Sequence, residues 1–161
     1  MSETDITQEV LRRLTYGLYV ATAVGADGPR AATISWVSQV SFRPRLVAVA
    51  MRKGTAICEA VRESRRFALH LIGAGQLDFA KAFFRVTHSG PDQIAGYRFR
   101  LSERGVPILD DAPAWLECEV VEEAGEQGDH QLYIAQIVGS GLRDACLNAL
   151  ALRDTPWHYG G

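Results

Sequence analysis

The chain has 161 residues, of which 47% are hydrophobic and 22% are charged, and its formal net charge is −2. This length and composition indicate a single soluble domain over residues 1–161, and no basic run exceeds a pair, which argues against a nucleic-acid partner. No apolar stretch approaches the roughly 20 residues of a membrane span, and the polar, acidic start is unlike a signal peptide, so we expect no membrane partner and a cytoplasmic location.

The first third of the chain predicts a helix followed by β-strands. Residues 4–14 form a short capped helical pattern with apolar residues along one face. Two β-rich runs within residues 16–37 flank an Asp-Gly-Pro turn at 25–29, which predicts a hairpin. A proline interrupts the strand pattern at 41–45, and the nearly continuous apolar run 46–51 is typical of a strand covered on both faces.

From Thr55 the period changes to that of a helix, with Thr55 as its cap. A strand at 67–72, a second amphipathic helix at 74–84 and a loop at 87–96 come next. Strands this short and numerous favour a barrel closed by antiparallel pairing over an open sheet, because closure removes exposed edges. Further strands are predicted at residues 97–101, 115–124 and 130–139, with a turn at 125–129 that pairs the last two.

The segment 33–41 carries the most informative polar pattern. As one strand it would place Thr33 and Ser35 on one face and Trp36 on the other, and would then run into a hydroxyl-rich turn at 38–41. Such a turn can offer hydroxyl and N–H groups to an anion or to the polar edge of a ring, and Trp36 can pack against a flat ligand. From the pattern alone, an ordinary strand with a core tryptophan is the favoured interpretation.

A second candidate site is the segment 52–55, Arg-Lys-Gly-Thr, which joins a buried strand to a helix. Two cations, a glycine that permits close backbone approach and a hydroxyl at a helix N-terminus suit a phosphate group. A solvated strand end with a capping threonine is the alternative explanation.

The histidines and cysteines offer few further sites. His130, directly after Asp129, can hydrogen-bond a ligand or supply a proton near neutral pH, although a turn histidine without a role is the commoner case. We expect His70 to face solvent or a dimer partner. No two histidines have the spacing of metal ligands, and three scattered cysteines do not form a disulfide framework, so we predict no metal site.

Four stretches, in this order, carry a family resemblance: the run from Tyr16 to Ile72, AWLECEV, GDHQLYIAQIVG and the ending WHYGG. Together they closely resemble the flavin reductase-like, FMN-binding split-barrel family, especially its flavoredoxin-like members. The resemblance implies a mainly β fold with short helices, a Greek-key split β-barrel of six or more antiparallel strands. It departs at Arg30 and Gln93, where family members often carry asparagine and lysine.

The resemblance also implies the roles of individual residues. Lys53 and Thr55 would hold the 5′-phosphate of FMN, His130 would approach the flavin ring as the catalytic residue, and Tyr159 from the tail would cover it. The isoalloxazine and ribityl chain would be wrapped by Thr33, Ser35, Trp36, Val37, Ser38, Gln39 and Ser41.

The activity implied by the resemblance is hydride transfer from NADH or NADPH to a flavin, which is FMN or alternatively FAD. Such a reductase would deliver reduced flavin to a monooxygenase or another acceptor protein, and two chains of a homodimer would share the flavin sites. Two alternatives remain: an electron carrier that keeps FMN as a prosthetic group, and a flavin-binding module without turnover.

Overall fold

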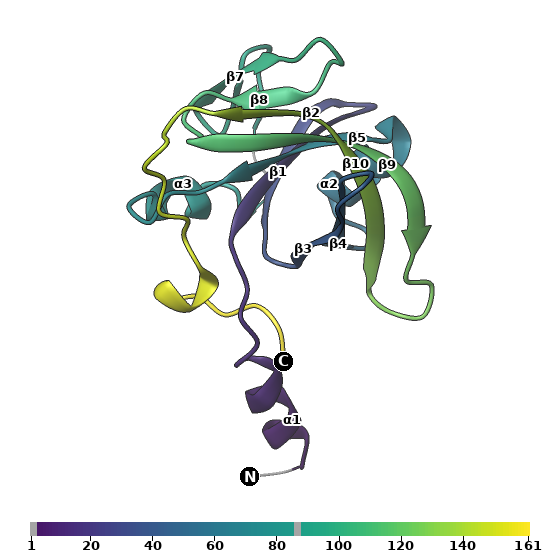
Figure 1. The fold of residues 1–161 in the computed structure, drawn as a ribbon, viewed down its shortest axis with the longest axis vertical. Coiled ribbons are helices and arrows are strands. Elements are labelled where there is room, and N and C mark those ends of the chain that lie inside the picture. The colour runs from purple at the N-terminus through teal and green to yellow at the C-terminus, as the bar shows by residue number, and fades with distance from the viewer. Residues whose placement is uncertain (1–2, 86–87) are drawn as a thin grey trace.

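A seven-stranded antiparallel sheet forms the body of the protein in the computed structural model, which describes residues 3–85 and 88–161 (Figure 1). Neighbouring strands are all antiparallel. The order across the sheet is β2 (Gly28–Ile34), β1 (Tyr19–Gly25), β5 (Arg66–Leu71), β9 (Ala114–Ala124), β10 (His130–Leu142), β4 (Leu46–Arg52) and β3 (Val37–Ser41).

The barrel is split between its two outer strands, β2 and β3, which do not pair with each other in the described chain. The expectation of an unbroken strand from Thr33 through Val37 is therefore wrong, because β2 ends at Ile34 and β3 begins at Val37. Between them the Trp36 carbonyl accepts a hydrogen bond from the Ala50 N–H at 3.0 Å, so the chain leaves β1 and joins β4 at this point. The expected turn at 38–41 is part of β3, and the sheet has a seam instead of full closure.

In the described residues, three α-helices and one 3-10 helix accompany the strands: α1 (Glu3–Leu11), α2 (Ala56–Ser64), α3 (Leu77–Lys81) and η1 (Leu152–Asp154). Thr55 caps α2 as predicted, since its hydroxyl oxygen accepts a hydrogen bond from the Cys58 N–H at 3.4 Å. Helix α3 is shorter than the predicted 74–84, because residues before it form a turn in which the Gln76 side chain accepts the Gly73 N–H.

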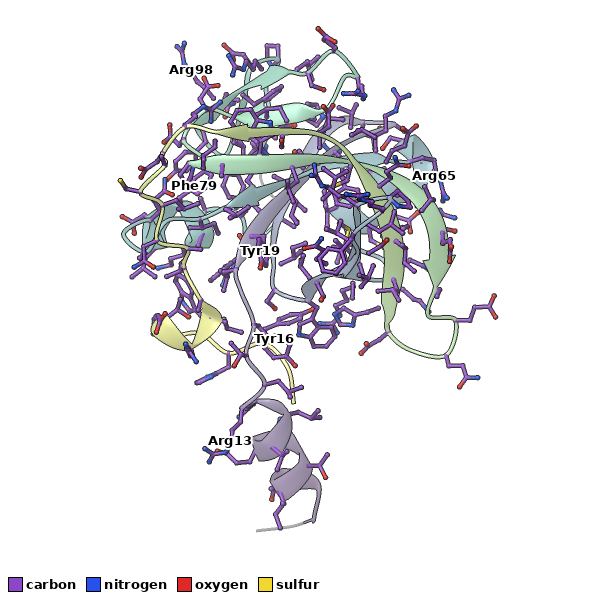
Figure 2. The ribbon with its side chains drawn as sticks, in the orientation of Figure 1. Arg13, Tyr16, Tyr19, Arg65, Phe79 and Arg98 are labelled. Carbon is purple, nitrogen blue, oxygen red and sulfur yellow. The ribbon has the colours of Figure 1, made fainter. Side chains whose placement is uncertain are left out.

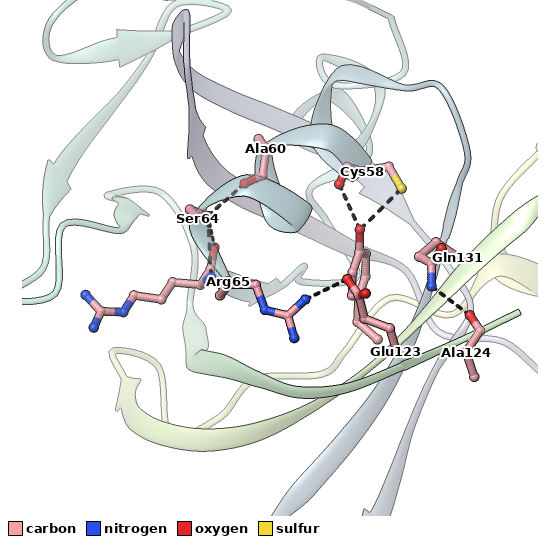
Figure 3. A network of polar contacts seen from close by, with 9 residues as sticks. Cys58, Ala60, Ser64, Arg65, Glu123, Ala124 and Gln131 are labelled. Carbon is pink, nitrogen blue, oxygen red and sulfur yellow. Dashed lines mark hydrogen bonds and ion pairs between the residues drawn. The ribbon is translucent and has the colours of Figure 1, made fainter.

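Helix α2 lies against the inside of the barrel. Its buried residues Ile57, Cys58, Ala60 and Val61 join the main core cluster with side chains from β1, β4, β5, β9 and β10. Polar contacts at both ends hold the helix there: Tyr133 donates to the Cys58 carbonyl at 2.9 Å, and Arg65 pairs with Glu123 at 2.6 Å (Figure 3). These contacts fix the position of α2 inside the barrel.

A second core cluster lies outside the barrel, under α3. It includes Phe79 and Phe83, which pack edge to face with ring centroids 5.4 Å apart (Figure 2 labels Phe79). A small three-stranded sheet of β6 (Gln93–Ile94), β7 (Tyr97–Leu101) and β8 (Pro107–Leu109) covers part of the same region. The expected loop at 87–96 thus contains β6, and its first residue, 87, lies outside the described residues.

His70 is fully buried, so the expectation that it faces solvent or a partner is wrong. Its Nδ1 lies 2.9 Å from the Val20 carbonyl oxygen on β1, and its Nε2 accepts the Leu109 N–H of β8 at 3.0 Å. The residue therefore joins the small sheet to the barrel.

Helix α1 projects from the barrel next to the C-terminus (Figure 1). Its predicted apolar face is exposed in the chain, with Ile6 and Val10 more than half accessible. None of the described helices is long and apolar enough to cross a membrane.

Candidate functional site

A pocket of about 520 Å³ opens beside the seam of the barrel. This volume lies in the range of about 300–1,000 Å³ that is usual for small-molecule and cofactor sites. Segments far apart in the sequence line it: 32–35, 50–52, Thr55 and Ile57, 83–84, and the tail residues 157–159. The pocket therefore runs from the start of α2 to the end of the chain.

Ser35 lines this pocket and carries a buried polar atom without a partner. Its side chain is 5% exposed, and its Oγ has no hydrogen-bond partner among the described residues. A buried hydroxyl without a partner costs roughly 1–3 kcal/mol, so it points to a ligand that completes it. The neighbouring Thr33 also lines the pocket, but its hydroxyl already donates to the Ala80 carbonyl at 2.6 Å.

One end of the pocket has the character of an anion site. Arg52 and Thr55 line it at the end of β4 and the start of α2. The Thr55 hydroxyl donates to the Arg52 carbonyl at 2.7 Å, which fixes the turn between them. A helix N-terminus presents free N–H groups and a partial positive charge, and Arg52 adds a full one, so this end can accept a phosphate.

Aromatic side chains gather around His130 beside the pocket. The Trp36 ring lies 4.4 Å from the imidazole of His130 and 5.2 Å from the ring of Tyr159, as centroid distances. The indole N–H of Trp36 is buried without a partner in the described chain. Tyr159 lines the pocket, whereas His130 reaches it through Tyr159.

His130 is held on both sides of its ring. Its Nδ1 lies 2.6 Å from the Asp129 carboxylate, and its Nε2 lies 2.6 Å from the Tyr159 hydroxyl. The hydrogen bond from His130 holds the pKa of Asp129 below its usual value, and burial raises the pKa of Tyr159. An ionised Asp129 accepts from Nδ1–H, so Nε2 of a neutral His130 accepts from the Tyr159 phenol.

Lys53 points away from the pocket. Its Nζ donates to the carbonyls of Gly125 and Gly128 at 2.6 and 2.7 Å, and to that of Glu126 at 3.4 Å. The resemblance assigned Lys53 to the phosphate, but Arg52 is the cation that lines the pocket.

The remaining predicted residues lie on β3, away from the pocket lining. Ser38 and Gln39 are exposed and bond to backbone carbonyls within β3: the Ser38 hydroxyl to Gln39 at 3.1 Å and the Gln39 amide to Ser41 at 3.2 Å. The structure therefore brings Thr33, Ser35, Thr55 and Tyr159 together around the pocket, with Trp36 and His130 behind them. It does not place there Val37, Ser38, Gln39, Ser41 or Lys53, nor the departing residues Arg30 and Gln93.

Two further aromatic residues that line the pocket were missed by the sequence reasoning. Phe84 and Trp157 pack edge to face with ring centroids 4.7 Å apart, and both line the pocket. Phe84 belongs to the end of an amphipathic helical pattern and Trp157 to the tail, so no local signal joins them. Among the described residues no group of three His, Cys, Asp or Glu side chains could hold a metal ion.

Comparison with known proteins identifies a flavin reductase-like domain over most of the chain. Residues 11–155 match the family model described as flavin reductase like domain. A diflavin flavoprotein, A 1 from a Synechocystis species, is 34% identical over 139 residues, which cover 86% of this chain and 24% of that protein. The chain spans about a quarter of the length of the curated relatives that it matches.

Solved structures of flavin reductases are similar to this fold over nearly the whole chain. The NADH:FAD oxidoreductase SgcE6 from Streptomyces globisporus is 25% identical with a TM-score of 0.78, and the match covers 93% of this chain and 88% of that one. The flavin reductase of the styrene monooxygenase from Pseudomonas putida S12 is 26% identical with a TM-score of 0.77, covering 96% of both chains.

Proposed function

Because this chain belongs to the flavin reductase-like family, we propose that it binds FMN in the seam pocket and catalyses its reduction by NADH or NADPH. When bound, the flavin would accept a hydride from the dihydronicotinamide at its N5, so that nicotinamide is oxidised and flavin reduced by two electrons. The chain's own task is to hold the two ring systems together and to supply the charges around them.

The observation that carries this proposal is the buried, unpartnered hydroxyl of Ser35, a residue that lines the pocket. A flavin ring has a polar edge of carbonyl and nitrogen groups that fits such a hydroxyl, and its flat face fits the apolar walls. Ile34, Met51 and Phe83 provide such walls. The residues present therefore fit a flavin.

The anion end gives the direction of binding. Arg52 and Thr55 at the start of α2 would hold the 5′-phosphate, and the ring system would extend toward Phe84 and Trp157. His130 lies opposite Arg52 in the β4–β10 register and contacts Tyr159, which lines the pocket. In this arrangement His130 and Tyr159 would border the entry of the nicotinamide nucleotide and supply a hydrogen-bond donor or acceptor to it.

A second candidate function is electron transfer with a permanently bound FMN. The matching relatives include diflavin flavoproteins about four times as long as this chain, in which the matched segment is only one part. Partners follow from the chosen function: a monooxygenase, as the Pseudomonas relative's name states for that protein, or another acceptor. We also propose a homodimer in the cytoplasm.

The rate of NADH and NADPH oxidation, measured against the concentration of added free FMN and FAD, separates these functions. A reductase that uses flavin as a substrate oxidises nicotinamide at a rate that rises with free flavin and then saturates. A carrier retains its FMN through purification and shows no nicotinamide oxidation. A protein that binds no flavin and oxidises no nicotinamide contradicts both functions.

A further inference from the structure

Lys53 follows Arg52 of the anion end in the sequence, yet its side chain does not line the pocket and binds backbone carbonyls of another segment. An ammonium group has three N–H donors. The three carbonyl oxygens of Gly125, Glu126 and Gly128 lie 2.6 to 3.4 Å from Nζ and match that number. No donor is left for a phosphate while these contacts persist.

The carbonyls that accept hydrogen bonds from Lys53 belong to the tight turn between β9 and β10. Gly125 has a φ of +103°, and a Cβ there would lie 2.7 Å from the His130 carbonyl oxygen. In this turn the three carbonyl dipoles converge on one point, where they repel one another unless a cation lies between them. The ammonium of Lys53 supplies that cation, and so stabilises this turn conformation.

The same turn leads directly into the residues that hold His130. The Lys53 N–H donates to the Asp129 carbonyl at 2.9 Å, so both the backbone and the side chain of Lys53 contact this segment. The Asp129 carboxylate accepts from His130 Nδ1–H at 2.6 Å, which leaves Nε2 to face Tyr159. The orientation and tautomer of the imidazole therefore depend on where the turn places Asp129.

We propose that Lys53 is a positioning residue for His130, acting through the 125–128 turn, and that Arg52 is the cation that meets the flavin phosphate. The inference rests on the proposed function for the part that concerns phosphate. The part that concerns the His130 tautomer stands on the geometry of the protein without ligand.

Binding of FMN compared with riboflavin tests the phosphate part, since riboflavin is the same molecule without the phosphate. The variant is Lys53→Met, and Lys81→Met is the matched control because the chain has no other lysine. We expect the ratio of riboflavin Kd to FMN Kd to stay within about twofold of wild type in both variants, and to fall about tenfold or more in Arg52→Met, as for a lost charge-assisted hydrogen bond. A tenfold fall in Lys53→Met would overturn the proposal and restore Lys53 as a phosphate ligand.

Nitrogen-15 NMR of histidine tests the positioning part on the protein without flavin. We expect His130, assigned by its absence in His130→Asn, to carry its proton on Nδ1 in wild type and in Lys81→Met. In Lys53→Met we expect a mixture of tautomers, while the signals of buried His70 stay unchanged and so report an intact fold. An unchanged His130 tautomer in a folded Lys53→Met would overturn the proposal.

A further measurement does not depend on the Lys53 variant folding. In Lys81→Met the single remaining lysine is Lys53, so its ammonium signal is unambiguous. We expect that signal to show hydrogen-bonded, slowly exchanging protons that do not shift when FMN is added. A shift upon FMN addition that riboflavin does not produce would overturn the proposal. If wild type binds neither flavin, the proposed function fails, and the two NMR measurements still decide the role of Lys53.

Discussion

Acid should destabilise this protein through His70 before most carboxylates titrate. The imidazole is fully buried between β1 and β8, where Nδ1–H donates to the Val20 carbonyl and Nε2 accepts from the Leu109 N–H. Both contacts require the neutral ring, because a protonated Nε2 would point its proton at another N–H group. Burial, with a smaller contribution from the positive charge of Arg143, lowers the pKa of His70 to about 4.

The magnitude follows from the difference between the folded and unfolded pKa values. The unfolded chain binds a proton to this histidine below a pH of about 6.5, whereas the folded chain resists protonation down to about 4. Stability from this residue is therefore fully present above pH 6.5 and is lost as the pH falls toward 4. At pH 5 the loss amounts to about 2 kcal/mol, from roughly 1.4 kcal/mol for each pH unit in that window.

Urea unfolding at pH 8 and at pH 5 measures this loss, with His70→Gln as the reference because its amide can donate and accept without titrating. We expect the free energy of unfolding of the wild type to fall by about 2 kcal/mol more than that of the variant between the two pH values. The carboxylates titrate alike in both proteins, so they cancel in this comparison. An equal fall in wild type and variant would refute the assignment of a neutral, buried His70.

Three further substitutions test the pocket. Ser35→Ala should weaken FMN binding and leave the free energy of unfolding equal or higher, because it removes a buried hydroxyl whose lack of a partner costs roughly 1–3 kcal/mol. A loss of stability in urea unfolding would show that Ser35 has a structural partner. Thr55→Ala should lower the stability by about 1 kcal/mol, since it removes the α2 cap. It should lower FMN affinity by a few kcal/mol at most, since the hydroxyl must turn from the Arg52 carbonyl to donate to a phosphate; unchanged affinity in a fluorescence titration would contradict the phosphate assignment. Tyr159→Phe should increase the KM for nicotinamide or change the turnover number with FMN affinity nearly constant, because it removes only the contact with His130 Nε2; steady-state kinetics that match the wild type would contradict a role for this contact.

The strands and helices were predictable where hydrophobic period and turn residues act locally. The hairpin of β1 and β2, the strand β4 and the Thr55 cap of α2 all follow from residues within a few positions of each other. The break at Ser35 and Trp36 was not predictable in this way. It arises because the chain stops pairing with β1 at Ile34 and pairs with β4 from Trp36 onward, a tertiary change that no local pattern reveals.

The site was predictable in its residue types more than in its geometry. The family resemblance identified Thr55 and Tyr159, which line the pocket, but assigned the phosphate to Lys53, whose side chain reaches a turn more than 70 residues along the chain. Strand β4 ends at Arg52, which lines the pocket, and Lys53 lies in the turn that follows, from which its side chain reaches the β9–β10 turn. Phe84 and Trp157 meet only through tertiary packing, which sequence period does not encode.

The visible absorption spectrum of the protein with one equivalent of FMN, recorded without oxygen before and after NADH and then NADPH, tests the central claim most directly. Binding of the flavin in the seam pocket predicts a perturbed flavin spectrum, and reductase activity predicts that its visible bands bleach with at least one nucleotide. Ser35→Ala is the matched control for the pocket, because it should reduce the perturbation. A flavin spectrum identical to that of free FMN, with no bleaching by either nucleotide, would contradict the account.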